Sequence, residues 1–319
     1  MTTGSTTSET KRRRQRFIRN PAGLPETITP RDTQMIQAVY DYRVLSTPQL
    51  YTLFFTPTLP TQQPSLLTPT TSCRRRLQRL WQHGFLARRE QKVRLCSEGT
   101  KPILYLLDVR GARLLAQLYD RDETDLAWQP ADNKHDTDFF EHFSASNDIR
   151  IAVTLAAKHG GYQLSVWHDE MTLKSPQMKD YVLLETSTGK KKKSAVVPDN
   201  YFVLATDTHV YHHFVETDRG TVTGEASSWD KRDWAERVKT YLAYHTSGKY
   251  QERYGSSGLR ILTVTTSDRR LANLKRITEE AGGTFRFWFT TFAQASPAAI
   301  LTEPIWSVAS KDNLYSLMR

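Results

Sequence analysis

Cysteine is scarce in this sequence, and long apolar runs are absent. Cys73 and Cys96 are the two cysteines among 319 residues, and neither has further cysteines or histidines at metal-ligand spacing. A disulfide framework is therefore not expected, and a reducing cytoplasm fits the chain. No run of about 18 apolar residues occurs, so we expect no membrane-spanning helix, and the N-terminus lacks the apolar stretch of a signal peptide. A glycine-rich phosphate loop is also missing, so no nucleotide cofactor is expected.

Acidic residues are few in the first third of the chain. Residues 1–119 hold 19 Lys and Arg against 7 Asp and Glu, whereas the remaining 200 residues hold 25 against 27. The whole excess behind the formal net charge of +10 therefore belongs to residues 1–119. Such segregation favours a polyanionic partner, and we prefer nucleic acid over a ribosomal or an anionic membrane surface.

The first 28 residues predict a basic arm. They are rich in Ser and Thr and include a run of five basic residues and one glutamine at 11–16. We expect this segment to be disordered and to lie along phosphates when a polyanion binds. A solubilising tail is the alternative interpretation.

Two helix starts follow the arm. Thr29-Pro30 and Thr47-Pro48 each place a hydroxyl side chain directly before a proline, which is typical of an N-cap and the first helical position. Apolar residues then recur at helical spacing after each start. The sequence therefore predicts two successive helices, separated from a third by a polar loop.

The third helix, from about Ser72 to Gly84, is predicted to be amphipathic. Its apolar stripe consists of Cys73, Leu77, Leu80 and Trp81. The opposite face and its flanks carry Arg74, Arg75, Arg76, Gln78, Arg79 and Gln82. Side chains of these types contact phosphates and base edges. A solvated arginine face on a structural helix is the alternative.

A basic β-hairpin is predicted next, with strands over Phe85–Arg89 and Ile103–Leu107. It adds the DNA-binding candidates Arg88, Lys92 and Arg94. Three helices followed by a basic hairpin is the order of a winged helix. Residues 29–119 therefore predict a winged helix-turn-helix domain that binds duplex DNA.

A second domain begins after an acidic linker. Residues 120–137 carry six acids against two basic residues and predict that linker, with the second domain over 138–295 and an unassigned tail over 296–319. The predicted strands are Tyr162–Trp167, Ala195–Leu204, Val210–Asp218, Leu259–Thr265 and Thr284–Phe289, and the predicted helices are Asp138–Lys158, Asp230–His245 and Arg269–Ala281. This order predicts an α/β sandwich with a mixed sheet, so the whole chain is of the α+β class.

Three carboxylates converge if two of these strands are neighbours. Asp199 opens one strand, and Glu216 and Asp218 share one face of the next because strand side chains alternate. Such a cluster is costly unless a divalent cation neutralises it, and oxygen ligands suit Mg²⁺ or Mn²⁺. A metal there would support phosphodiester hydrolysis. Ordinary strand-end acids in an inactive domain are the alternative.

The Val-Pro-Asp stretch that ends at Asp199, with the helix–strand–strand–strand–helix–strand order around it, resembles the PD-(D/E)xK nuclease fold. That fold is the α/β/α arrangement of restriction endonucleases. The resemblance implies that Asp199 and Glu216 are metal-binding acids and that Glu141, on the preceding helix, is an additional one.

This sequence departs from the nuclease pattern at one position. The motif lysine falls at Asp218, which carries the opposite charge. Some members of that fold supply a basic group from the following helix, where Lys231 and Arg237 flank the predicted buried stripe. Either residue is expected to replace the lysine in catalysis, and the sequence leaves the choice open.

Several short motifs between residues 29 and 290 resemble one protein family over most of the chain. They are Thr29–Asp32, Val44–Leu50, Arg75–Leu80, Gly84–Leu86, His142 with Asn147, Val197–Asp199, Val215–Thr221 and Tyr241–Tyr244. Together they resemble the replication-relaxation family of plasmids and integrative elements, and the Glu-Thr-Asp-Arg-Gly-Thr stretch is the most specific of them.

The family resemblance implies DNA handling for a mobile element, in replication, transfer or copy control. Duplex DNA is the expected partner; further replication or transfer proteins and a homodimer on DNA are left open. Two functions remain open as well. One is a metal-dependent DNA-cleaving protein, and the other is a non-catalytic initiator, accessory protein or transcriptional regulator with an inert nuclease-like scaffold.

Overall fold

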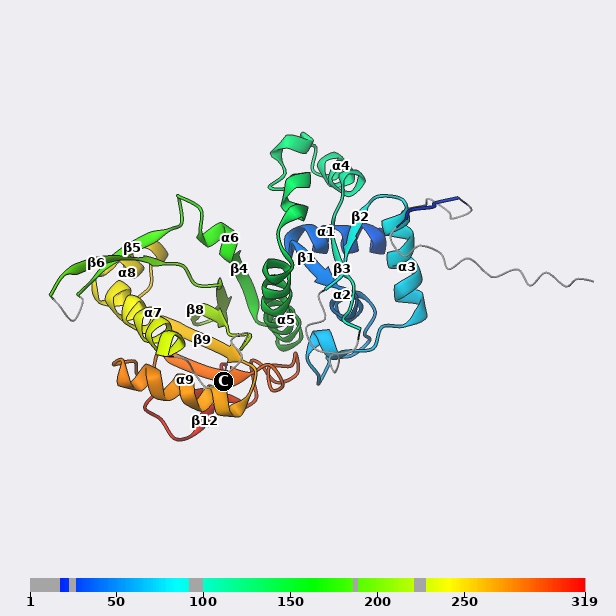
Figure 1. The fold of residues 1–319 in the computed structure, drawn as a ribbon. Coiled ribbons are helices and arrows are strands. Elements are labelled where there is room, and N and C mark those ends of the chain that lie inside the picture. The colour runs from blue at the N-terminus through cyan, green and yellow to red at the C-terminus, as the bar shows by residue number, and fades with distance from the viewer. Residues whose placement is uncertain (1–17, 23–26, 92–99, 186–188, 221–227, 319) are drawn as a thin grey trace, which may run out of the picture.

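The computed structural model describes residues 18–22, 27–91, 100–185, 189–220 and 228–318, with the backbone alone for residues 228–232. Two β-sheets organise these residues: a three-stranded sheet near the N-terminus and a seven-stranded sheet in the rest of the chain (Figure 1). A two-stranded hairpin stands beside the larger sheet. Among the described helices, none has the length and apolarity to cross a bilayer.

The N-terminal region alternates helices with the strands of the small sheet. Its elements are α1 (Pro30–Asp41), β1 (Val44–Ser46), α2 (Thr47–Phe54), α3 (Thr71–Gln82), β2 (Leu86–Arg89), β3 (Leu104–Leu107) and α4 (Val109–Leu118). β3 lies between β1 and β2 and pairs antiparallel with both. The predicted helices and hairpin strands are therefore present, and β1 is an additional short strand.

The predicted cap of α1 is confirmed, whereas α2 begins one residue earlier than predicted, with Ser46 and not Thr47 as its N-cap. The Thr29 hydroxyl accepts from the N–H of Asp32, and the Asp32 carboxylate accepts from the N–H of Thr29. Ser46 and Gln49 form the same reciprocal pair at the start of α2. Such capping boxes satisfy donors that the first helical turn leaves unpaired.

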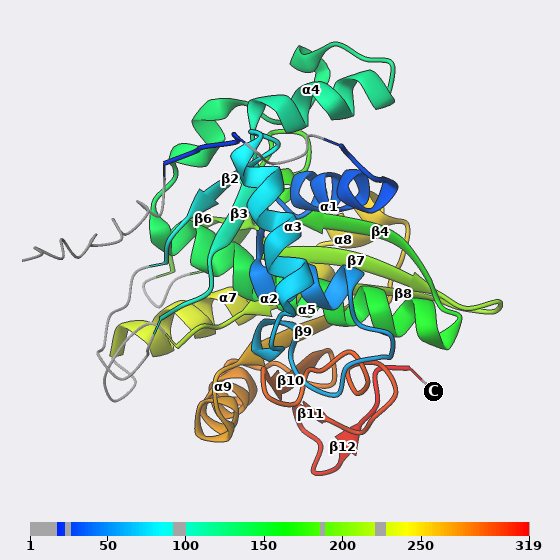
Figure 2. The same ribbon diagram turned by 90° about the vertical axis from the view of Figure 1, so that its right-hand side faces the viewer.

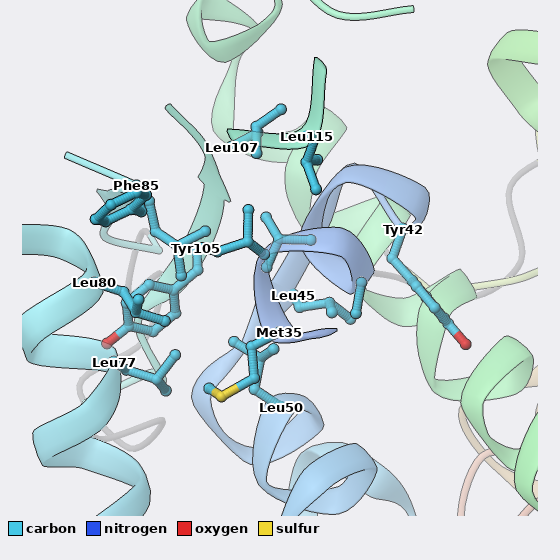
Figure 3. Packing of buried hydrophobic residues seen from close by; sticks show 14 of the residues in the cluster. Met35, Tyr42, Leu45, Leu50, Leu77, Leu80, Phe85, Tyr105, Leu107 and Leu115 are labelled. Carbon is cyan, nitrogen blue, oxygen red and sulfur yellow. The ribbon is translucent and has the colours of Figure 1, made fainter. Parts of the chain in front are cut away.

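The apolar stripe of α3 is confirmed by burial. Leu77 and Leu80 point into a core that includes Met35 and Leu50 from the first two helices and Tyr105 from β3 (Figure 3). The opposite side of α3 faces outward, toward the viewer in Figure 2. The chain leaves α3 through Gly84, whose φ of 76° is readily adopted by glycine alone.

The larger sheet is mixed, as predicted. Its strands are β4 (Gln163–Asp169), β7 (Asn200–Ala205), β8 (Val210–Thr217), β9 (Arg260–Thr265), β10 (Phe287–Thr291), β11 (Trp306–Val308) and β12 (Leu314–Tyr315). They lie in the order β4-β7-β8-β9-β10-β11-β12. β8, β9 and β10 run parallel, and the other neighbouring pairs are antiparallel.

Helices cover both faces of this sheet (Figure 1). The long helix α5 (Thr137–Gly160) packs through Ala152 and Val153 against Phe202 and Val215. On the other face, α7 (Ser228–Thr246), α8 (Lys249–Tyr254) and α9 (Asp268–Glu280) contribute to a second core. A short helix, α6 (Glu170–Leu173), directly follows β4.

The structure differs from the sequence prediction on both sides of Pro198. The predicted strand Ala195–Leu204 is two strands, because β6 (Lys191–Val196) pairs with β5 (Asp180–Glu185) outside the main sheet, whereas β7 lies within it. Proline has no N–H for a strand ladder, and the break falls there. Residues 296–319, left unassigned as a tail, contribute β11 and β12 to the sheet.

α5 lies between the N-terminal region and the larger sheet and packs against both. Its first half packs through Phe140 and Phe143 against Val44 and Leu104 of the small sheet. The acidic stretch 120–137 packs onto the N-terminal region as well, since Leu126 is buried in that region's core. The two sheets therefore share one helix, and part of the stretch predicted as the linker packs against the N-terminal region.

Candidate functional site

Three acidic residues lie in one row at the ends of neighbouring strands. Asp169 pairs with Asn200, and Asn200 pairs with Val215. Extending both pairings by one residue places Glu170 beside Asp199 and Asp199 beside Glu216. The three acids therefore form a row where β4, β7 and β8 meet the same end of the sheet. Asp199 and Glu216 are buried, with 8% and 2% of their surface exposed.

Asp199 is held in place by two neighbours. One of its oxygens accepts a 2.7 Å hydrogen bond from the N–H of Thr217, and the other lies 3.4 Å from Nε2 of His142. Burial alone would raise the pKa of Asp199, but the hydrogen bond and charge of His142, with the charge of Arg237, lower it overall. The carboxylate is thus ionised near neutral pH.

His142 and Glu170 complete a group with Asp199. His142 Nε2 lies 3.9 Å from a carboxylate oxygen of Glu170, and one donor atom from each of the three residues lies within 4.8 Å of the others. Burial alone would lower the pKa of His142, but Asp199 and Glu170 raise it overall. Within the described parts of the chain, no other three His, Cys, Asp or Glu residues come together in this way.

The donor set fits a divalent cation. Ligand atoms that share one cation at bond lengths of about 2.0–2.2 Å lie roughly 3–4 Å apart. The separations of 3.4 Å and 3.9 Å from His142 to the two carboxylates are in this range. Two carboxylates and an imidazole form a mixed oxygen and nitrogen set. An imidazole ligand suits Mn²⁺ better than Mg²⁺, which prefers oxygen. Of the two metals expected from sequence, Mn²⁺ is therefore the better match.

Glu216 extends the site on the side of α7. Its carboxylate accepts from the guanidinium of Arg237 and from the hydroxyl of Tyr241. Burial raises the pKa of Glu216 to about 7, an effect that the charge of Arg237 opposes and that of Asp199 reinforces. The guanidinium of Arg237 thus binds Glu216, and the Arg237 side chain is 45% exposed.

Two predicted acids lie outside this group. Asp218 pairs with Arg270 of α9 and accepts from the Thr265 hydroxyl. Glu141 binds Arg219 and lies 3.3 Å from Lys101. The expected convergence of Asp218 with Asp199 and Glu216 is therefore not found, and α5 contributes His142 in place of its neighbour Glu141.

The structure describes the side chain of only one of the two residues predicted to replace the motif lysine. Arg237 lies at the site, in contact with Glu216. Lys231 belongs to α7, but its side chain falls outside the described residues. Of the two candidates, Arg237 is therefore the one whose side chain the structure describes.

Sequence reasoning missed Glu170 and gave His142 no role as a ligand. Glu170 follows β4, which runs two residues beyond its predicted end at Trp167. An acidic pair, Asp169-Glu170, at the end of a strand was the available signal. This signal does not identify a site by itself, because only the register between β4 and β7 places Glu170 beside Asp199.

The predicted DNA-binding face of α3 is divided in the structure. Arg74 and Arg75 are exposed, and no ion pair or hydrogen bond of their side chains occurs with any described residue. Arg76 instead pairs with Asp32, and Arg79 donates to the carbonyl of Thr27 at 3.2 Å. The two glutamines of this face, Gln78 and Gln82, are partly buried. The side chain of Gln82 accepts a hydrogen bond from the N–H of Asn20.

The hairpin arginines are also engaged with the fold. Arg88 lies over the ring of Trp81 at 4.4 Å and donates to the Tyr105 hydroxyl at 3.1 Å. Arg89 donates to the carbonyl of Asn133 at 2.8 Å and lies over Phe140. The remaining candidates, Lys92 and Arg94, fall outside the described residues, as does the basic run 11–16.

Fold and site together define a mixed α+β protein with a partly buried cluster of one His and two carboxylates where strands of its larger sheet end. The model of the Replication-relaxation family matches residues 36–259, and the chain belongs to that family. No curated protein matches the chain.

Two solved structures show a weak likeness. One is the restriction endonuclease FokI bound to DNA, at 10% identity and a TM-score of 0.26, and the other is FokI alone, at 12% and 0.27. In both cases the match covers 83% of this chain. It spans less than half of FokI, 43% and 42% of the two chains.

Proposed function

We propose that this protein processes DNA and that His142, Glu170 and Asp199 hold a divalent cation for phosphodiester hydrolysis. The observation that carries the proposal is the row of acids across three strands, with His142 beside it. A cation in such a site activates water and stabilises the charge that develops on the phosphate. Family membership supports a DNA substrate, and we infer a role in the replication or transfer of a mobile element, in the cytoplasm.

Arg237 is the residue we assign to the phosphate. A guanidinium stays protonated at any physiological pH, so it cannot act as a base, but it can stabilise negative charge on the reacting group. Its contact with Glu216 uses Nη1, so the guanidinium has further N–H donors for a substrate. Glu216 therefore acts as a positioning residue for Arg237.

We further propose that residues 29–119 are a winged helix that docks the protein on duplex DNA. The element order α1-β1-α2-α3-β2-β3 is that of a winged helix, in which α3 would be the recognition helix. Arg74 and Arg75 project from its exposed side. On this division, residues 120–137 join the docking domain to a PD-(D/E)xK-like domain over 138–295.

A second function is supported by the charge balance of the site. His142 faces Asp199 and Glu170, and Arg237 faces Glu216, so the acids have cationic partners of their own. Asp218 occupies the position of the motif lysine and is paired with Arg270. These contacts fit a non-catalytic initiator, accessory protein or regulator built on an inert scaffold.

Plasmid cleavage separates the two functions. The full chain is incubated with supercoiled plasmid and Mn²⁺ or Mg²⁺, beside Asp199→Asn and a matched control, Asp207→Asn, on the exposed loop between β7 and β8. We expect nicking with Mn²⁺ that the control retains and that Asp199→Asn loses by at least 100-fold. Equal nicking by all three proteins, or none with either metal, would contradict cleavage at this site; absence of cutting with normal duplex binding would favour the second function.

A further inference from the structure

A second concave site lies at the opposite edge of the larger sheet. A hollow of about 490 Å³ opens where β8, β9 and β10 begin, bordered by β11 and β12. Tyr211 lines it, whereas Glu216 lies five residues further along β8, about 17 Å of strand away. This volume is in the range of small-molecule and nucleotide pockets. The hollow shares no residue with the acidic site.

Aromatic rings form part of the wall. Tyr211, Trp288 and Tyr315 line the hollow, and the rings of Trp288 and Tyr315 lie 5.9 Å apart. Phe285 stands at the rim with 56% of its surface exposed. Flat apolar surfaces of this kind stack on the faces of nucleobases, and an exposed phenylalanine gains most from such a contact.

Three cations share the hollow with these rings. The Arg260 guanidinium lies 5.0 Å from the ring centre of Tyr211 and 4.9 Å from that of Trp288, and it donates to the carbonyl of Leu317 at 2.7 Å. Arg286 lies 4.7 Å from the ring of Phe285, and Lys311 is exposed. None of the described residues that line the hollow is Asp or Glu. The hollow is therefore positive as well as aromatic.

This combination selects a flat, aromatic and anionic ligand. A nucleotide unit meets all three conditions, since its base can stack and its phosphate can bind the cations. Paired bases within a duplex are stacked on one another, so an unpaired base is required. Exposed Val210 and Phe285 at the rim extend the apolar surface beyond the hollow, which suits a strand better than a free nucleotide.

We propose that this hollow binds single-stranded DNA, with one unpaired base against the aromatic wall and the adjoining phosphates on Arg286 and Lys311. The site is independent of the proposed catalytic centre and of the winged helix. Arg260 orders the aromatic wall through its contacts with Tyr211 and Trp288 and with the carbonyl of Leu317, which follows β12.

The test is fluorescence anisotropy of the full chain with a labelled 12-residue oligo-dT. Phe285→Ala with Arg286→Ala removes exposed atoms from the rim and leaves Arg260 in place. We expect the Kd for oligo-dT to rise at least tenfold, while the affinity for a duplex stays within twofold. A matched control, Leu183→Ala with Arg276→Ala, removes an exposed apolar residue and an exposed arginine elsewhere. It is expected to keep the wild-type affinity for both DNAs.

Photocrosslinking locates the strand directly. Oligo-dT that carries 4-thiothymidine is expected to crosslink to peptides containing Tyr211, Phe285 or Trp288, and the crosslink is expected to disappear in the double variant. Crosslinks confined to the N-terminal region, an unchanged Kd in the double variant, or binding of free mononucleotide without binding of the oligonucleotide would each overturn the proposal.

Discussion

The amide of Gln49 on α2 donates a 2.8 Å hydrogen bond to the carboxylate of Asp148 on α5. Both side chains are buried, and the same amide also donates to the carbonyl of Ser144 at 2.7 Å. The other end of Gln49 accepts from the N–H of Ser46 and so completes the cap of α2. The Gln49 side chain therefore caps the start of α2 and also links α2 to α5, the helix that packs on the larger sheet.

Asp148 makes the stability of this junction depend on pH. Burial raises its pKa to about 7, although hydrogen bonds from Ser65 and Gln49 oppose that rise. An unfolded aspartate has a pKa of about 3.9, so the folded state binds the proton more tightly. The free energy of unfolding therefore falls as the pH rises from about 4 to 7 and levels off above that.

Asp148→Asn cannot ionise and is expected to remove this slope. Relative to the variant, the wild type should lose up to about 3 kcal/mol of unfolding free energy between pH 5 and pH 8. Urea denaturation at the two pH values measures the difference. Asp207→Asn on an exposed loop serves as the control and should keep the wild-type slope. Parallel pH profiles of Asp148→Asn and the wild type would contradict the assignment.

Arg74 and Arg75 are predicted to contact duplex phosphates. Each phosphate contact contributes about 0.9 to the slope of log K against log salt. Replacing both residues with Ala should therefore weaken duplex binding and reduce the magnitude of the slope by about 2. A salt titration provides the measurement, with Lys158→Ala and Arg276→Ala as a control that removes two charges elsewhere. An unchanged slope would take α3 out of the interface.

Local signals were sufficient for most elements of the fold. The cap of α1 and the apolar stripe of α3 each lie within about ten residues of sequence, and the structure contains both. The second helix was also predicted from its local sequence, with its cap one residue later than the observed Ser46. β1 spans three residues and β12 two, too few for a period to be recognised. Their existence depends on pairing with β3 and β11, which is a long-range property.

The candidate site was also predictable only where local sequence signals position its residues. Asp199 and Glu216 stand at strand ends that the sequence indicates, and Arg237 lies on a helix whose buried face can be worked out. The pairing of Glu170 with the row depends on the register between β4 and β7, which includes an irregularity between Leu164 and Val166. A sequence pattern does not determine such a shift.

The pair Arg237 and Glu216 is expected to contribute to stability. Removing the arginine leaves Glu216 buried without its cation, which costs about 3–5 kcal/mol for a fully buried pair. Because Arg237 is 45% exposed, we expect about 2 kcal/mol for Arg237→Ala, less than in the buried case. Adding Glu216→Gln should recover most of the loss. Chemical denaturation of both single variants and the double variant gives the coupling; additive losses would show that the ion pair contributes nothing.

Metal binding distinguishes the cluster found in the structure from the one expected from sequence. His142→Ala and Asp199→Asn each remove a donor from the group, so each should weaken Mn²⁺ binding at least tenfold in calorimetry. Asp218→Asn removes an acid that the sequence placed in the site but that pairs with Arg270, and it should bind Mn²⁺ as the wild type does. Circular dichroism checks that each variant is folded. Loss of binding in Asp218→Asn with retention in His142→Ala would mean that the cation, if bound, follows the sequence motif and not the row across β4, β7 and β8.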